Sequence, residues 1–285
     1  MKKLIDVSTH QGVIDWEKVK PHIDGAILRC GYGSNLEKQD DAQFKRNADE
    51  CTRLGIPFGV YLYSYADNNA EAKSEAEHVL RLVKPYKLSY PVYLDLEEAG
   101  KTDGMIERAN IFGDIVEKAG YWCGVYSSTS WWNTHLKGLE RFTKWVAQWY
   151  KECTYKGANL DMWQYSDKGT IPGIKGNVDM NYCYRDFPAL IAKAKEPEKT
   201  IAELAKEVIA GKHGAGAERK KSLGSKYEAV QAEVNRILSG KKTVAEIAKE
   251  VIAGKWGYGQ KRKKRLMAAG YDYNAVQKEV NRLMK

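Results

Sequence analysis

The chain has 285 residues, of which 43% are hydrophobic and 11% aromatic, so a largely disordered chain is excluded. No apolar run is long enough to cross a bilayer, and we expect no membrane insertion. The net charge of +9 is uneven: residues 1–190 carry 24 Lys and Arg against 26 Asp and Glu, and residues 191–285 carry 22 against 11. This split predicts two parts with different roles.

Strand-like and helix-like segments alternate through the first 190 residues. Strands are expected at 3–8, 25–31, 57–65, 90–97, 121–128, 144–150, 161–165 and 177–182, and helices at 41–54, 69–83 and 104–120. Alternation of this kind indicates parallel strands, and eight of them suggest a barrel. A complete (β/α)8 barrel usually takes about 250 residues, so we expect an incomplete TIM-like α/β barrel over residues 1–190.

The connections that are shorter than those of a complete barrel lie near the end of this part of the chain. The connections at 151–160 and 168–176 are short and contain several glycines. A parallel crossover generally needs a dozen or more residues, usually with a helix. We therefore expect the last strands to connect as hairpins.

Four acids are expected at one mouth of this barrel. Within 90–97, Tyr93, Asp95 and Glu97 alternate with apolar residues, so they face the interior near the carboxyl end of the strand, where barrel active sites are built. Asp6 ends the first strand, and Asp179 lies on the last. Carboxylates held close together raise at least one pKa, which supplies a proton donor for glycoside hydrolysis. The structural alternative is that some of these acids only pair with Arg29 or with backbone amides.

Flat aromatic side chains near the strand ends suit sugar rings, although each alone is more often a core residue. Neither the five scattered histidines nor the five cysteines have metal-ligand spacing, so we expect free thiols, no metal and no cofactor. The expected substrate-binding residues are Arg29, Tyr32, Tyr63, Tyr65, Tyr126, Trp149, Trp163 and Gln164.

Residues 1–188 resemble the N-acetylmuramidases of glycoside hydrolase family 25. The resemblance rests on the segments DVSTHQG, YLDLE, WQY and VDMN. It implies a (β/α)5(β)3 barrel, with Glu97 as general acid and Asp95 positioning the substrate's 2-acetamido group or supporting the transition state. Asp6 and Asp179 would place water or substrate. A covalent mechanism with Asp179 or Asp95 as the nucleophile stays open.

The basic tail contains an internal repeat. After a linker at 191–199, residues 200–239 and 243–285 align at offsets of 43 and then 46 residues, with AKEVIAGK and EVNR in both copies. Thr200 with Glu203, and Thr243 with Glu246, have the spacing of a capping box. Each copy predicts a small three-helix bundle. The run at 261–265, KRKKR, is either a solvated helix face or a site for an anionic polymer.

The two copies resemble the cell-wall-binding repeats of a choline-independent pneumococcal phage lysozyme, which implies that they bind the disaccharide–peptide unit of peptidoglycan. Candidate binding residues are Trp256, Tyr258, Arg262 and Arg219. The first copy departs from the second where His213 replaces the tryptophan, which predicts weaker binding there. The alternative for Trp256 is a packed core aromatic.

The two resemblances together predict a lysozyme of the phage endolysin type. It would cut the β-1,4 bond between N-acetylmuramic acid and N-acetylglucosamine, anchored to the muropeptide of a Gram-positive wall and not to nucleic acid. The polar N-terminus predicts no signal peptide, so we expect synthesis in the host cytoplasm and release through a holin. Three alternatives remain: a chitinase-like or N-acetylglucosaminidase enzyme, a bacterial autolysin, and a non-catalytic wall or nucleic-acid binder. The oligomeric state stays open.

Overall fold

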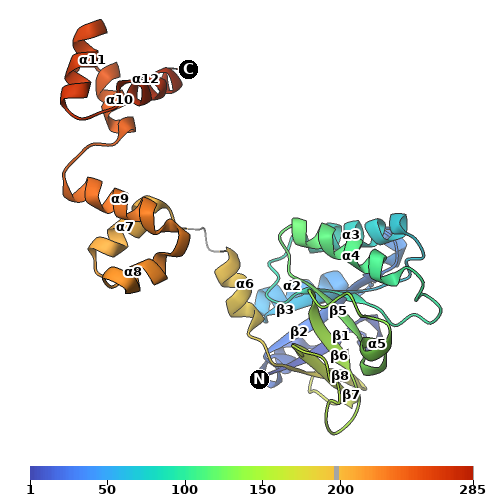
Figure 1. Cartoon of the computed structure of the whole chain (residues 1–285). Helices are drawn as coiled ribbons and strands as arrows, with labels where there is room; N and C mark the ends of the chain where they lie inside the picture. Colours follow the sequence, from blue (N-terminus) through green and yellow to red (C-terminus); the bar gives the residue numbers. More distant parts are fainter. Residues whose placement is uncertain (196–198, 285) are drawn as a thin grey trace. The chain divides into compact units, whose positions relative to one another are not determined.

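The computed structural model describes residues 1–195 and 199–284 and divides into two compact units, residues 1–196 and 197–285. The first unit is built on a closed barrel of eight strands in chain order (Figure 1). The strands are β1 (Lys2–Val7), β2 (Gly25–Tyr32), β3 (Phe58–Tyr63), β4 (Val92–Asp95), β5 (Cys123–Ser128), β6 (Thr143–Ala147), β7 (Met162–Gly169) and β8 (Val178–Cys183).

Helices follow each of the first five strands and the last one. They are α1 (Trp16–Val19), α2 (Phe44–Leu54), α3 (Asn69–Val83), α4 (Met105–Lys118), α5 (Thr129–Thr134) and α6 (Phe187–Lys195). The segments between β6 and β7 and between β7 and β8 contain no helix. The helices α2, α3 and α4 were predicted from the sequence, whereas the short α1 and α5 were not. Helix α6 extends into the segment 191–199 that was expected to be a linker.

Of the two hairpins predicted for the last strands, the one between β7 and β8 is confirmed and the one between β6 and β7 is wrong. β7 and β8 pair antiparallel, and β8 closes the barrel antiparallel to β1, but β6 and β7 pair parallel. The expected sixth strand ran to residue 150, whereas β6 ends at Ala147. The connection therefore spans residues 148–161, which is long enough for an extended parallel crossover without a helix.

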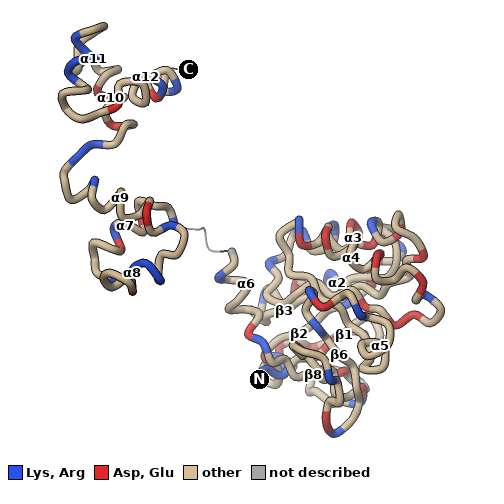
Figure 2. Tube along the Cα trace, viewed as in Figure 1, with Lys and Arg blue, Asp and Glu red and all other residues tan. Residues whose placement is uncertain are grey.

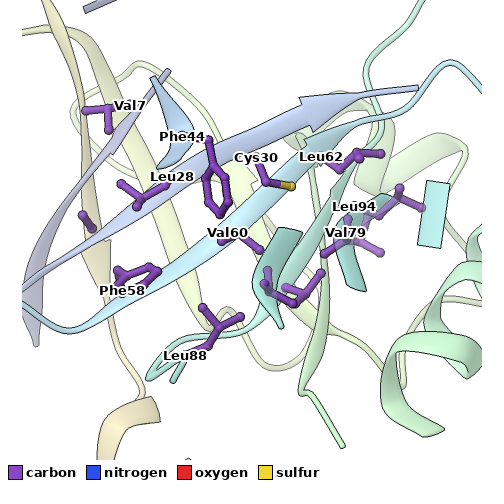
Figure 3. Packing of buried hydrophobic residues seen from close by; sticks show 14 of the residues in the cluster. Val7, Leu28, Cys30, Phe44, Phe58, Val60, Leu62, Val79, Leu88 and Leu94 are labelled. Carbon is purple, nitrogen blue, oxygen red and sulfur yellow. The ribbon is translucent and has the colours of Figure 1, made fainter. Parts of the chain in front are cut away.

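Two hydrophobic layers hold the first unit together. The outer layer lies between the strands and the helices and includes Leu28, Val60 and Val79 (Figure 3). The inner layer fills the barrel, where the ring of Trp145 packs against Tyr93 and Tyr126 with centroids 5.1 and 4.5 Å apart. Trp145 is almost fully buried and forms the floor beneath the polar mouth.

The second unit contains two groups of three helices. The first comprises α7 (Ile201–Ile209), α8 (Gly216–Leu223) and α9 (Tyr227–Leu238), and the second α10 (Val244–Ile252), α11 (Gly259–Ala268) and α12 (Tyr273–Leu283). Both predicted capping boxes form, at Thr200 and Thr243. Each group has a small apolar core of its own. Within the described parts of the chain, no helix is long and apolar enough to cross a membrane.

Candidate active site

Side chains from all eight strands meet in an open pocket of about 320 Å³ at the carboxyl ends of the parallel strands. Asp6 and Asp179 lie directly opposite each other, because β1 and β8 pair antiparallel with these residues in register. Asp95 ends β4, and Glu97 follows it on the same side. All four predicted catalytic acids therefore line one pocket, together with residues His10, Arg29, Tyr61, Tyr63, Tyr126, Trp145, Trp149, Gln164 and Asp167.

A hydrogen-bond network holds Asp6 in a fixed orientation. The side-chain amide of Asn181 donates to Asp6 at 2.7 Å, and that of Gln164 donates to both carboxylate oxygens at 3.1 and 3.2 Å. The amides are themselves oriented: Trp145 donates its indole N–H to the carbonyl oxygen of Asn181, and Tyr126 donates to that of Gln164. Each NH2 group is thereby directed at Asp6.

Asp6 and Asp179 titrate as a pair. Burial, followed by the charge of Asp179, raises the pKa of Asp6 well above its usual value, while the amide donors oppose this shift. Burial and then the charge of Asp167 raise the pKa of Asp179 to about 6. Two carboxylates this close do not both ionise readily, so the pair holds a proton near neutral pH.

Burial also raises the pKa values of the two remaining acids. For Glu97 the further causes are the negative charges of Asp179 and then Glu98. For Asp95, which is almost fully buried, the charges of Glu97 and Asp6 add to the effect, and Arg29 opposes it. One oxygen of Asp95, Oδ1, is buried without a hydrogen-bond partner. Glu97 therefore keeps its proton to a higher pH than a free glutamic acid does.

Arg29 supplies positive charge to the pocket but pairs with none of the four acids. Its Nε donates to Asp41 at 2.7 Å, and the carboxylate of Asp41 is fully buried. Asp41 also accepts the backbone N–H of Thr9 at 2.9 Å, which ties the loop after β1 to the same carboxylate. The alternative that Arg29 neutralises Asp6 or Asp179 directly is thus contradicted, since a fifth acid holds the guanidinium.

The predicted aromatic residues either line the pocket, pack beside a residue that lines it, or lie outside it. Tyr126 and the exposed Trp149 line the pocket, and both donate hydrogen bonds to Gln164, whose amide thus serves mainly to position Asp6. Tyr63 also lines the pocket and donates to Glu98 at 2.8 Å. Tyr65 packs on Tyr63 with ring centroids 5.0 Å apart, and Tyr32 meets Tyr65 edge-on at 6.1 Å.

Trp163 does not line the pocket. It lies on the outer face of β7, is 7% exposed, and packs against Tyr165 and Tyr182 with centroids 5.8 and 6.0 Å away. Its indole N–H donates to the backbone of Gln148. The prediction that Trp163 contacts substrate is therefore not supported by its position, because strand alternation directs Gln164, and not its neighbour, inward.

Several residues that line the pocket or hold its side chains in place were not predicted from the sequence. Tyr61 precedes Tyr63 by two positions, and Trp145 lies on the inward face of β6, so strand alternation could have found both. Asn181 belongs to the VDMN segment but was not selected. The roles of Asp41 and Glu98 could not be predicted from any sequence pattern, because they depend on contacts with residues distant in sequence.

Among the four candidates in the repeats, Tyr258 is the most exposed, at 77%. Trp256 is half-buried, lies edge-on to Tyr271 and donates its indole N–H to Glu250. Its packing agrees with the alternative of a core aromatic. In the first copy, His213 occupies the equivalent position and meets Glu207, the equivalent acid, at 3.3 Å.

The two candidate arginines make equivalent contacts in the two copies. Arg219 donates to the backbone oxygen of Gly214 and to Gln231. Arg262 donates to the backbone oxygen of Gly257 and to Gln277. The arginine therefore closes the turn before α8 or α11 in each copy.

An eight-stranded α/β barrel with paired acids at its mouth is an arrangement suited to glycoside hydrolysis. The described residues contain no cluster of His, Cys, Asp or Glu that could hold a metal ion. The model of glycosyl hydrolases family 25 matches residues 5–174, and the CW_7 repeat model matches residues 202–238 and 245–284. The chain belongs to family 25 and is a glycoside hydrolase of the lysozyme type, which confirms both predicted resemblances.

Three relatives illustrate the similarity. The Escherichia coli K12 protein YegX, described as uncharacterized, is 32% identical over 62% of this chain and 67% of its own length. The modular autolysin LytC of Streptococcus pneumoniae, solved with a synthetic peptidoglycan ligand, is 36% identical with a TM-score of 0.57, over 63% of this chain and 46% of its own. The Streptomyces coelicolor lysozyme is 26% identical with a TM-score of 0.59, over 68% of this chain and 96% of its own.

Proposed function

We propose that the chain hydrolyses the β-1,4 bond between N-acetylmuramic acid and N-acetylglucosamine in peptidoglycan, with Glu97 as the general acid. The observation that carries this proposal is the environment of Glu97. Burial and the charges of Asp179 and Glu98 raise its pKa, so the carboxyl stays protonated further toward neutral pH. A protonated carboxyl in an open pocket can protonate the leaving glycosidic oxygen.

Asp95 orients the 2-acetamido group of the sugar on the glycone side of the bond. Its carboxyl group lines the pocket, where it can accept the amide N–H of that group. The acetamide oxygen then attacks the anomeric carbon while Glu97 protonates the leaving oxygen. The Glu97 carboxylate next takes a proton from the water that opens the cyclic intermediate, which restores the acid. Asp179 and Asp6 position that water.

The Glu97→Gln variant tests the assignment, because glutamine keeps the size of the side chain but cannot donate a carboxyl proton. We expect release of soluble fragments from purified sacculi to fall by about 10²–10⁴-fold. Sedimentation of the variant with sacculi should match that of the unmodified chain. Lysis within about threefold of the unmodified rate would overturn the assignment.

We further propose the type of barrel, the ligand of the repeats and the wall on which the chain acts. The first unit is a (β/α)5(β)3 barrel, and the repeats are two three-helix bundles that bind the muropeptide of a Gram-positive wall. An endolysin role, with accumulation in the host cytoplasm before release to the wall, is consistent with this target. Binding of the full chain to Gram-positive sacculi, compared with thin Gram-negative sacculi of equal mass, tests the choice of wall.

A further inference from the structure

The basic helix α11 has a cationic face that the fold of the repeat does not require. Of the five cations at 261–265, two make contacts inside their own bundle. Arg262 donates to Gly257 and Gln277, and the ammonium of Lys263 lies 5.6 Å from the ring centre of Tyr273. Equivalent contacts occur in the first copy, through Arg219 and through Lys220 over Tyr227. These two cations therefore belong to the common scaffold.

The other three cations are Lys261, Lys264 and Arg265. They are exposed, and their spacing of three and four residues places them on one side of α11. Figure 2 shows the Lys and Arg positions along this helix in blue. None of the three pairs with a carboxylate among the described residues.

The acids of the same bundle are all engaged elsewhere. Glu246 completes the capping box, and Asp272 caps α12. Glu250 pairs with Lys242 and Glu279 with Arg282. The positive charge of Lys261, Lys264 and Arg265, which we call the α11 cationic face, is thus left uncompensated.

The first copy provides an internal comparison. At the positions equivalent to Lys261, Lys264 and Arg265 it has Glu218, Lys221 and Ser222, which carry no net charge. Both copies nevertheless form the same three helices with similar apolar cores. The three-helix fold therefore does not require the charge of the α11 cationic face. Only the second copy carries this charge.

We propose that the α11 cationic face binds an anionic polyol-phosphate polymer of the bacterial wall. Closely spaced ammonium and guanidinium groups fit a regular ladder of phosphodiesters, since each phosphate contact releases a counterion. The choice of a wall polymer rests on the proposed action on Gram-positive peptidoglycan.

The test measures affinity of the full chain for purified, soluble poly(glycerol phosphate) by isothermal titration calorimetry. Because this probe contains no peptidoglycan, its outcome is independent of whether Glu97 is catalytic. The variant Lys261→Glu with Arg265→Ser converts the α11 cationic face to the composition of the first copy. We expect the Kd of this double variant to rise about tenfold or more in about 150 mM salt.

A matched control has the same change of net charge on other exposed positions of the bundle, Lys249→Ser with Lys278→Glu. Its Kd should stay within about twofold of the unmodified value. Equal weakening by the two double variants would overturn the proposal, since net charge alone would then explain binding. Tighter binding of a short DNA duplex, or of vesicles rich in anionic phospholipid, through the same two residues would also overturn it.

Discussion

The pKa of Glu97, the proposed proton donor, depends on the charge of its neighbours. Asp179 is the charged side chain with the largest effect on the pKa of Glu97, and Glu98 acts in the same direction with a smaller effect. Asp179 lies across from Asp6 because β8 runs antiparallel to β1. The antiparallel strand β8 thus places the carboxylate that, after burial, does most to raise the pKa of Glu97.

The Asp179→Asn variant should shift the pH dependence of its residual activity. Removing a negative charge lowers the pKa of Glu97, so the proton required for catalysis is lost at a lower pH. The alkaline limb of the kcat/KM profile should therefore move toward acid. Glu98→Gln should move the limb the same way by less. An alkaline limb that stays in place in Asp179→Asn would contradict the electrostatic coupling.

At the residue scale, the sequence identified the acids better than their partners. Strand alternation correctly directed Asp95 into the barrel, because the apolar neighbours of an inward residue must face the helices. The same rule would have rejected Trp163, which neighbours the inward Gln164. The amides that orient Asp6 and the acid that holds Arg29 could not be predicted, since they depend on the register of strands far apart in sequence.

At the scale of elements, the end of β3 is fixed by a buried acid on α3. Glu75 accepts a hydrogen bond from the Ser64 hydroxyl at 2.8 Å and from the Tyr65 backbone N–H at 2.7 Å. These contacts hold the end of β3 and the loop after it, which carry the aromatic rings of Tyr63 and Tyr65 respectively. Burial raises the pKa of Glu75 to about 7.

Glu75 should make the barrel less stable as the pH rises. Its pKa is higher in the folded than in the unfolded state, so its contribution is fully present below about pH 4.5 and is lost as the pH rises through about 7. We expect Glu75→Gln to reduce the fall in unfolding free energy between pH 5 and pH 8 by about 2 kcal/mol. Denaturant titrations at the two pH values measure this.

The matched control is Glu77→Gln, an exposed position on the same helix. Its pH dependence should equal that of the unmodified chain. A fall in stability that is the same in Glu75→Gln and in the unmodified chain would show that the proton on Glu75 does not contribute.

Elements were predicted well where hydrophobic periodicity was long and poorly where it was short. The bounds expected for α3 match the structure exactly, while α1 and α5 are too short to give a helical period. The parallel pairing of β6 with β7 was missed because the strand boundary was placed three residues too late. The expected pairing direction depends on the number of residues that connect the two strands. An error of a few residues in a strand boundary changes that number.

At the scale of the whole molecule, the charge split separates catalysis from retention on the wall. A chain ending at residue 196 keeps α6, whose Phe187 and Ile191 belong to the inner layer of the barrel. We expect this chain to cleave short soluble glycan oligomers at the unmodified rate but to release fragments from sacculi at least about tenfold more slowly. Assays on the two substrates in parallel measure the difference.

A chain ending at residue 186 is the control for that truncation. It lacks Phe187 and Ile191, so its melting temperature should fall below that of the 196-residue chain. An equal loss of activity on both substrates in the 196-residue chain would contradict the division of roles between the units.

The identity of the new reducing end in digested sacculi tests the central claim most directly. Products are reduced with borohydride, hydrolysed and analysed by mass spectrometry. Cleavage by a muramidase predicts that reduced muramic acid accumulates with time in the unmodified chain and not in Glu97→Gln. Accumulation of reduced glucosamine instead, or fragment release without new sugar ends, would contradict the account.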